Sequence, residues 1–200
     1  MLYYENKFKR QGYDLIIGVD EAGRGCLAGP VVAAAVLLKN KNFKSRIDDS
    51  KKLSPAQRER AFPEIIRKSV FGVGIVNEKV IDRLNILVAT RIAMEDAIAA
   101  VVKDLKPKRE KRIQVLVDGN VKLQTPLAVA NIVRGDSRSN SIACASILAK
   151  VTRDMMMVYY DKVYPGYGFL QHKGYPTKSH RLALERLGLS RIHRVSFRHG

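Results

Sequence analysis

Short runs of apolar residues recur along the chain, and each is bounded by glycine, proline or charged residues. Continuous apolar runs of this length are typical of strands buried on both faces of a sheet. They predict strands over residues 15–19, 31–38, 70–76, 113–117 and 127–133. The first run stops before two adjacent acids, and neighbouring residues of a strand point to opposite faces. Both acids can therefore serve one site only if the backbone turns there, and the sequence favours a turn at Ala22, Gly23, Arg24 and Gly25.

Longer periodic segments predict helices between and after these strands. One begins at Ser54, which can cap it, with Pro55 at the first helical position and Gln57 completing a capping box. Pro63 predicts a kink or break in this helix. Further helices are expected over about residues 85–103, 141–160 and 178–187, and small residues along the first of these indicate close packing on a sheet. Strands first, then strands alternating with helices, predict an α/β layer fold with a mixed sheet.

Composition narrows the class of protein and its partner. The chain has 200 residues, 46% of them hydrophobic, which suits one domain with a sizeable core. Its 36 Lys and Arg against 19 Asp and Glu give a net charge of +17, more than solubility requires. Nucleic acid is the commonest polyanionic partner of such a chain, although a merely basic surface stays an alternative. Residues 171–200 hold seven Lys and Arg and one acid, so we expect this tail, Arg194 included, near phosphates.

The cysteines and the length of the apolar stretches indicate the cellular compartment of the protein. Cys26 and Cys144 lie far apart in apolar surroundings with no zinc-ligand spacing, so both are expected to be buried, reduced thiols. No stretch approaches eighteen apolar residues, and the N-terminal residues lack an apolar signal core. We expect a cytoplasmic protein without a membrane segment.

Four acids follow the apolar runs: Asp20, Glu21, Asp118 and Asp136. Strand ends converge on one edge of the sheet in layered α/β folds, so these acids can gather although they are remote in sequence. Such a cluster repels itself and favours hard divalent ions such as Mg²⁺ or Mn²⁺. Two alternatives stay open, because Asp118 also begins a good turn sequence and Asp136 precedes a helix that it could cap.

A glycine-arginine-glycine triplet, Gly23, Arg24 and Gly25, follows the first two acids. A plain tight turn would explain it. The functional interpretation is that two residues without Cβ let backbone groups touch a ligand closely, and a sugar hydroxyl, both donor and acceptor, would fit such a surface.

Five motifs carry a resemblance to a known family: DEAGRG at residues 20–25, DSKKLS at 49–54, GDS at 135–137, ASILAKVTRD at 145–154 and YGFLQHKGYPT at 167–177. Together they resemble ribonuclease HII, the type 2 ribonuclease H, and they span nearly the whole chain. The resemblance implies a ribonuclease H-like α/β fold, with a five-stranded mixed sheet flanked by helices and a C-terminal helical extension. We expect one catalytic domain over residues 1–200, with a core at about 13–160 and a basic extension at about 161–200.

The resemblance also implies an activity. It is that of a metal-dependent endonuclease that hydrolyses the RNA strand of RNA–DNA hybrids and cuts 5′ to single ribonucleotides in duplex DNA. Two Mg²⁺ or Mn²⁺ ions would serve the reaction, which leaves 5′-phosphate and 3′-hydroxyl ends. A monomer is expected. The implied roles are metal binding and catalysis for Asp20, Glu21, Asp118 and Asp136, reading of the ribose 2′-hydroxyl for Gly23, Arg24 and Gly25, and packing on the neighbouring sugar for Tyr175.

Other residues admit two interpretations. Lys51, Lys52, Lys173 and Lys178 are candidate phosphate contacts, and the first two could equally be a solvated charge pair. His172 and His180 could shuttle protons or simply be hydrogen-bonded in place. Four tyrosines could stack on bases or anchor a small core: Tyr159, Tyr160, Tyr164 and Tyr167.

Two rival functions fit the charge alone. One is a different nuclease or a recombinase on a related fold, and the other is a non-catalytic nucleic-acid-binding module. A binding module would lose little on Asp118→Asn, whereas a DNA nuclease would cut an all-DNA duplex.

Overall fold

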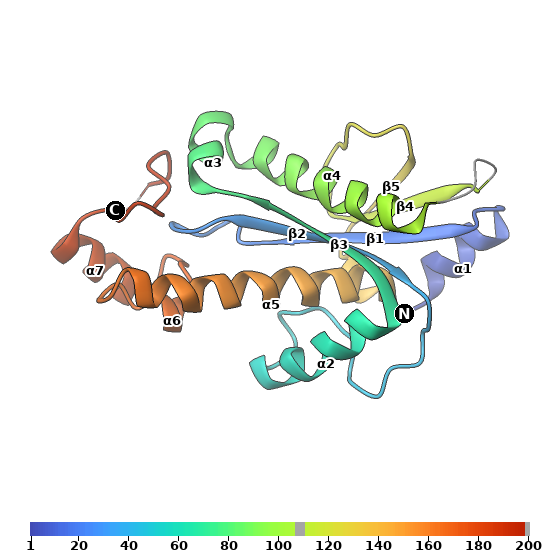
Figure 1. Ribbon diagram of the computed structural model, residues 1–200, viewed down its shortest axis with the longest axis horizontal. Helices are drawn as coiled ribbons and strands as arrows, with labels where there is room; N and C mark the ends of the chain where they lie inside the picture. The colour runs from blue at the N-terminus through green and yellow to red at the C-terminus, as the bar shows by residue number, and fades with distance from the viewer. Residues whose placement is uncertain (107–110, 199–200) are drawn as a thin grey trace.

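A five-stranded mixed sheet forms the centre of the computed structural model, which describes residues 1–106 and 111–198 (Figure 1). The strand order is β3-β2-β1-β4-β5. The strands are β1 (Leu15–Ala22), β2 (Val31–Leu38), β3 (Ser69–Val76), β4 (Ile113–Asp118) and β5 (Ala128–Ile132). β1, β2 and β3 pair antiparallel, while β4 is parallel to both β1 and β5. This confirms the predicted mixed sheet. The charged sequence KPKREKR at residues 106–112, which is typical of a connector before β4, lies largely outside the described residues.

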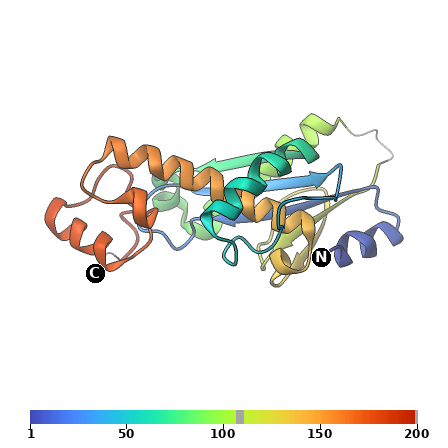
Figure 2. The same cartoon turned by 90° about the horizontal axis from the view of Figure 1, so that it is seen from below.

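Helices cover both faces of the sheet. α4 (Ile86–Leu105) lies on one face, and α5 (Asn140–Val163) with α2 (Pro55–Lys68) lies on the other (Figure 1). Seen from below, α5 runs along the sheet toward α6 (Phe169–His172) and α7 (Lys178–Leu187), at the end of the molecule opposite α1 (Figure 2). α5 continues through the expected boundary near residue 160, and the division into core and extension stays a prediction. No helix in the described parts of the chain is long and apolar enough to cross a membrane.

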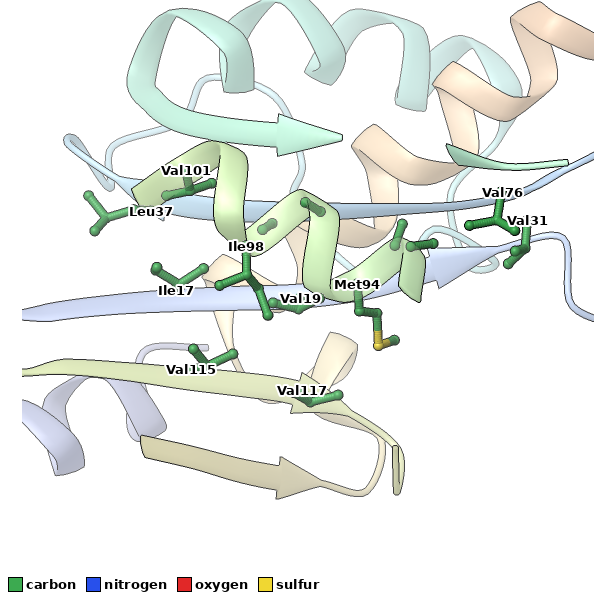
Figure 3. Close-up of a cluster of buried hydrophobic side chains, with 14 of the residues drawn as sticks. Ile17, Val19, Val31, Leu37, Val76, Met94, Ile98, Val101, Val115 and Val117 are labelled. Atoms are coloured by element: carbon green, nitrogen blue, oxygen red, sulfur yellow. The ribbon is translucent and has the colours of Figure 1, made fainter. Parts of the chain in front are cut away.

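The main hydrophobic core lies between the sheet and α4. Ile17 and Val19 of β1 and Val115 and Val117 of β4 face Met94, Ile98 and Val101 of the helix (Figure 3). On the edge strand, a Cβ at Gly72 or Gly74 would collide with backbone carbonyls of α4, so the helix sits directly on these glycines. The close packing expected from its small residues is confirmed.

β1 continues past the predicted strand end at Val19 as far as Ala22, and the turn follows at Arg24 and Gly25, within the predicted residues 22–25. Asp20 and Glu21 pair with Ala34 and Ala33 of β2, so the ladder with the neighbouring strand carries the backbone straight through both acids. The strand continues because β2 supplies hydrogen-bonding partners as far as Ala22. The residues next to the acids in the sequence do not indicate which strand will pair with them.

Strand alternation then separates the two acids. Ile17 and Val19 face α4, and Ile16 packs on the opposite side with Leu116 and Ile132. By the same alternation, Asp20 faces α5 and Glu21 faces the α4 side.

Pro63 does not break α2. Its missing N–H would have bonded the carbonyl of Glu59, an exposed residue whose carbonyl can turn to water. The predicted capping box at Ser54 is present, and Ala61 and Ile65 bury the inner face of the helix. Packing and the cap together outweigh the lost bond.

Three short helices were not predicted: α1 (Tyr3–Arg10), α3 (Glu78–Leu84) and α6. α1 depends on a distant contact, because the buried carboxylate of Glu5 accepts hydrogen bonds from Ser139 Oγ (2.6 Å), Ser141 Oγ (2.8 Å) and the Ser141 amide (2.9 Å). α3 is capped by Asn77, whose side chain accepts from the Val80 amide.

Candidate active site

Three carboxylates meet where β1 and β4 end. The parallel register pairs Val19 with Val117, so Asp20 and Asp118 follow at the same level and on the same face. Asp136 arrives from η1 (Gly135–Ser137), the turn of 3₁₀-helix after β5. One carboxylate oxygen from each of the three lies within 4.8 Å of the others. The gathering of these acids, predicted from the strand ends, is confirmed.

Local backbone geometry brings Asp136 to the cluster. Arg134 adopts a left-handed conformation (φ 54°), and the Gly135 amide then donates to Asp118 Oδ1 at 2.6 Å. A Cβ at Gly135 would lie 2.6 Å from Ile142 Cδ1, so a larger residue there would require the end of the Ile142 side chain to move. The N-cap interpretation of Asp136 is wrong, because Ser139 caps α5.

Glu21 borders this group from the other side of the strand. Its amide donates to Asp20 Oδ1 at 2.7 Å, and its carboxylate forms an ion pair with Arg24 at 3.3 Å. Glu21 is not among the three residues whose oxygens converge, but its charge and that of Asp118 act on each other.

The electrostatics of the cluster are those of crowded, buried acids. Burial raises the pKa of Asp20 well above its ordinary value, and the carboxylates of Glu21 and Asp118 raise it further. Burial, with the charges of Asp118 and Asp49, raises the pKa of Asp136 to about 6. Burial also raises the pKa of Glu21, while Arg24 opposes that shift. An all-oxygen, negatively charged donor set of this kind fits a hard divalent cation.

The two glycines of the triplet have different surroundings. Gly23 is buried, has φ +95°, and a Cβ there would collide with the side chain of Arg153 and lie 2.8 Å from the Pro30 carbonyl. Gly25 is exposed, and a Cβ there would meet nothing within 4 Å. The fold therefore requires glycine at 23, whereas at 25 it leaves an open surface.

Two fully buried arginines hold the segment that contains this turn. Arg194 donates to the carbonyls of Gly23 (2.7 Å), Arg24 (2.9 Å) and Gly29 (2.8 and 3.0 Å). Arg153 of α5 donates to the Pro30, Ala28 and Lys173 carbonyls at 2.8–3.0 Å. The expectation that Arg194 lies near phosphates is wrong, because its guanidinium is bound to backbone inside the protein.

Tyr175 lies beside the turn. The Leu27 amide donates to the Gly174 carbonyl at 2.8 Å, which joins the two segments. The ring of Tyr175, 37% exposed, has Lys150 Nζ 5.2 Å and the Arg153 guanidinium carbon 5.8 Å from its centroid. Burial raises the pKa of its hydroxyl, and the nearby Cys26 adds to that shift. The Tyr175 side chain thus lies close to Cys26, the residue that follows Gly25.

A protein-family model for ribonuclease HII matches residues 17–199, a span that contains the acids, the turn, both buried arginines and Tyr175. The chain belongs to the ribonuclease HII family. Members are metal-dependent ribonucleases H, so the protein is a hydrolase with endonuclease activity on RNA–DNA hybrids. The rival assignment to a non-catalytic binding module is excluded.

Individual relatives agree along nearly the whole chain. A ribonuclease HII of Geobacter sulfurreducens is 50% identical over 196 residues, covering 98% of this chain and 87% of that protein. The structure of the PCNA:RNase HII complex from Archaeoglobus fulgidus contains a chain that matches with a TM-score of 0.74 at 25% identity, over 92% of this chain and 95% of that one. The ribonuclease H2 of Pyrococcus horikoshii gives 0.69 at 27% identity, over 92% and 94%. These structures confirm the ribonuclease H-like fold.

In this ribonuclease HII, the DSKKLS motif lies against the acid cluster. The ammonium of Lys51 opposes the upward shift that burial and neighbouring acids give the pKa of Asp136. Lys52 instead pairs with Asp48, at 3.7 Å. Asp49 also lies near Asp136 and accepts a hydrogen bond from the Lys51 amide at 2.8 Å. Asp49 was not among the predicted site residues. Its position as the first residue of the DSKKLS motif could have indicated that it belongs to the site.

The two lysines of the C-terminal region differ in their surroundings. Lys173 is half-buried and its ammonium donates to the Leu170 carbonyl. Lys178, at the start of α7, is exposed. The role of both as phosphate contacts stays a prediction.

His172, His180 and His193 lie together in the interior of the protein, where hydrogen bonds hold their rings. The rings of His172 and His180 stack with centroids 4.2 Å apart, and His180 Nε2 lies 3.0 Å from His193 Nε2. His172 Nε2 donates to the Tyr167 carbonyl at 2.8 Å, and His180 Nδ1 donates to the Tyr175 carbonyl at 2.9 Å. Burial lowers the pKa of His172. This favours the hydrogen-bonded interpretation, in which His180 holds the backbone of Tyr175.

The tyrosines and cysteines mostly follow the structural interpretation. Tyr160, Tyr164 and Tyr167 pack in a small core with Phe169 and Leu184, whereas Tyr159 is exposed. The two cysteines, Cys26 and Cys144, are free and buried, as predicted, and burial raises the pKa of both thiols.

Proposed function

We propose that this ribonuclease HII, besides hydrolysing the RNA strand of hybrids, cuts on the 5′ side of single ribonucleotides embedded in duplex DNA. The observation that carries the proposal is the closeness of a cluster of three acids to a turn with an open, glycine-lined surface. The acids supply a site for phosphodiester hydrolysis, and the turn, which begins two residues after Glu21, supplies backbone groups beside it. One site can therefore select a ribose and cut next to it.

Asp20, Glu21, Asp118 and Asp136 would hold two divalent ions, Mg²⁺ or Mn²⁺. Such ions polarise a phosphate, lower the pKa of a water molecule and stabilise a leaving 3′-oxygen, which gives 5′-phosphate and 3′-hydroxyl products. Asp118 is fixed for this task by the Gly135 amide, and Asp20 by the Glu21 amide. Glu21, on the other face of β1, is oriented by its ion pair with Arg24.

The turn at Gly23, Arg24 and Gly25 would meet the ribose 2′-hydroxyl through its backbone, and Tyr175 would pack on the adjacent sugar. Gly25 leaves open the surface that the sugar needs, and the partly exposed Tyr175 lies close to Cys26, the next residue along the chain. A deoxyribose has no hydroxyl for this turn, so an all-DNA duplex would bind without being cut.

Lys51 is the best placed of the four candidate lysines for a phosphate contact, since its charge already acts on the acids. Lys52, Lys173 and Lys178 would contact phosphates farther along the duplex. The protein would act as a monomer. The two buried free thiols support action in the reducing cytoplasm.

A labelled DNA duplex with one ribonucleotide tests the proposal directly. We expect cleavage 5′ to the ribonucleotide in Mg²⁺ or Mn²⁺, with 5′-phosphate and 3′-hydroxyl ends, and no cleavage in excess chelator. The matched all-DNA duplex should stay intact. Cleavage of an RNA–DNA hybrid alone, or products with cyclic phosphate ends, would overturn the proposal while leaving the family assignment in place.

A further inference from the structure

Arg194 is bound to the turn although 170 residues separate it from Arg24. Its planar guanidinium donates to the Gly23 and Arg24 carbonyls, which belong to two successive peptide groups, and to the Gly29 carbonyl. Each bond involves a charged donor and a buried or half-buried acceptor, and such bonds are stronger than bonds between neutral groups. Arg194 thus fixes the orientation of two peptide planes.

The geometry of the peptide bond determines what those planes present on their other side. In a trans peptide the C=O and N–H of one group point in opposite directions, and the described chain contains no cis peptide. The carbonyls of Gly23 and Arg24 point inward at Arg194, so the amides of Arg24 and Gly25 point away from it. Within residues 1–106 and 111–198, neither amide donates a hydrogen bond. Two adjacent donors are therefore left at the exposed surface of Gly25.

We propose that Arg194 is a positioning residue for ribose recognition, because it holds the Arg24 and Gly25 amides as a preset pair of donors for the 2′-hydroxyl oxygen. This inference rests on the proposed function, since it concerns the same turn. A hydroxyl oxygen has two lone pairs and can accept from both amides at once. A deoxyribose offers no oxygen at that place. Arg194 itself stays buried and does not touch the substrate.

Arginine is suited to this role and lysine is not. The guanidinium carries five donors in a rigid fork, which here spans three carbonyls, whereas an ammonium is a compact charge on a flexible stem. A cation bonded to a carbonyl also polarises the peptide group, which makes the N–H at its other end a better donor. Arg194→Lys keeps the charge and loses the fork.

Arg153 is the matched control within the same loop. It is also fully buried and also donates to three carbonyls, but these belong to Ala28, Pro30 and Lys173. Arg153→Lys should therefore destabilise the segment to a similar extent without releasing the peptide planes of Gly23 and Arg24.

The experiment measures preference for ribose rather than activity alone. Binding of a duplex with one ribonucleotide and of its all-DNA counterpart is measured in chelator, where no cleavage occurs, for wild type, Arg194→Lys and Arg153→Lys. We expect Arg194→Lys to lose at least about tenfold of the wild-type preference and Arg153→Lys to keep it. Equal preference in wild type and Arg194→Lys, with both folded, would overturn the inference. A wild type that neither prefers nor cuts the ribonucleotide duplex would instead overturn the proposed function.

A measurement on the wild-type protein covers the case in which Arg194→Lys does not fold. Hydrogen exchange at the Arg24 and Gly25 amides should be fast in the free protein, because neither amide is hydrogen-bonded within the part of the chain that the structure describes. Both should become protected on binding the ribonucleotide duplex and stay fast with the all-DNA duplex. Equal protection by the two duplexes would contradict the assignment of these amides to the 2′-hydroxyl.

Discussion

The acid cluster and the neighbouring turn are built on opposite principles. In the cluster, Asp20 and Asp136 are buried beside other acids, and their pKa values are raised because burial and mutual repulsion disfavour the charged forms. In the turn, the carbonyls of Gly23 and Arg24 are bound by a buried cation. In the cluster, the native fold retains electrostatic repulsion between buried acids. In the turn, the carbonyls have a buried hydrogen-bond donor. Substitutions of the acids should therefore cost activity, whereas substitution of the buried Gly23 in the turn should cost stability.

The largest effect is expected for Asp118→Asn, and Asp20→Asn should behave alike. Removing a charge that we propose binds the metal ions should lower cleavage by orders of magnitude. The melting temperature in metal-free buffer should stay level or rise, because a source of repulsion has gone. Cleavage assays and thermal unfolding measure the two quantities, with the exposed Asp96→Asn on α4 as the control. Full activity in Asp118→Asn, or a large fall in its melting temperature, would break the contrast between cluster and turn.

The two glycines of the turn sharpen the contrast at one site. Gly25→Ala adds a methyl group to open surface, so the fold should be unchanged while cleavage of a single-ribonucleotide duplex falls by about tenfold or more. Gly23→Ala collides with Arg153 at a positive φ, and its melting temperature should fall by several degrees. Thermal unfolding and cleavage of the same duplex separate the two. A stable Gly23→Ala variant would show that the turn is less fixed than its bonds indicate.

A third, smaller effect concerns pH in metal-free buffer. Because burial raises the folded-state pKa of Asp136 to about 6, the folded protein binds this proton more tightly than the unfolded chain does. Its contribution to stability is present at low pH and is lost as the pH rises through about 6. Asp136→Asn should therefore be more stable than wild type at about pH 7 by a few degrees, and the difference should shrink by about pH 5. A difference that does not change over this range would contradict the raised pKa.

The smallest effect is expected for surface charges of the C-terminal region. Lys178 and Arg191 are exposed, so replacing both by Gln should weaken duplex binding a few-fold for every sequence. The slope of log affinity against log salt should become shallower by about one for each phosphate that is no longer neutralised. Lys103→Gln on the exposed side of α4 is the control. An unchanged slope in the double variant would mean that these charges are only solvated.

The strand ends could be predicted from the sequence because their signal is local. Asp118 directly follows the apolar run at residues 113–117. Such a run predicts a strand from its own residues, without knowledge of the strands that pair with it. The structural role of Arg194 could not be predicted, because its partners are backbone carbonyls about 170 residues away along the chain. In a sequence, a buried arginine cannot be told from an exposed one. α1 was missed for a similar reason, because Glu5 is held by serines at the start of α5. The extent of β1 was set by a ladder partner that local sequence does not reveal.

The long reach of Arg194 has a consequence for the order of folding. The acids of the cluster all lie within residues 20–136, and one of its bonds, between Gly135 and Asp118, spans 17 residues. The bonds from Arg194 to Gly23 and Arg24 close loops of 171 and 170 residues, and contacts so distant in sequence form late. A chain on its way to the native state would therefore acquire its affinity for divalent ions first. Its ability to tell ribose from deoxyribose would come afterwards, with the docking of its final segment.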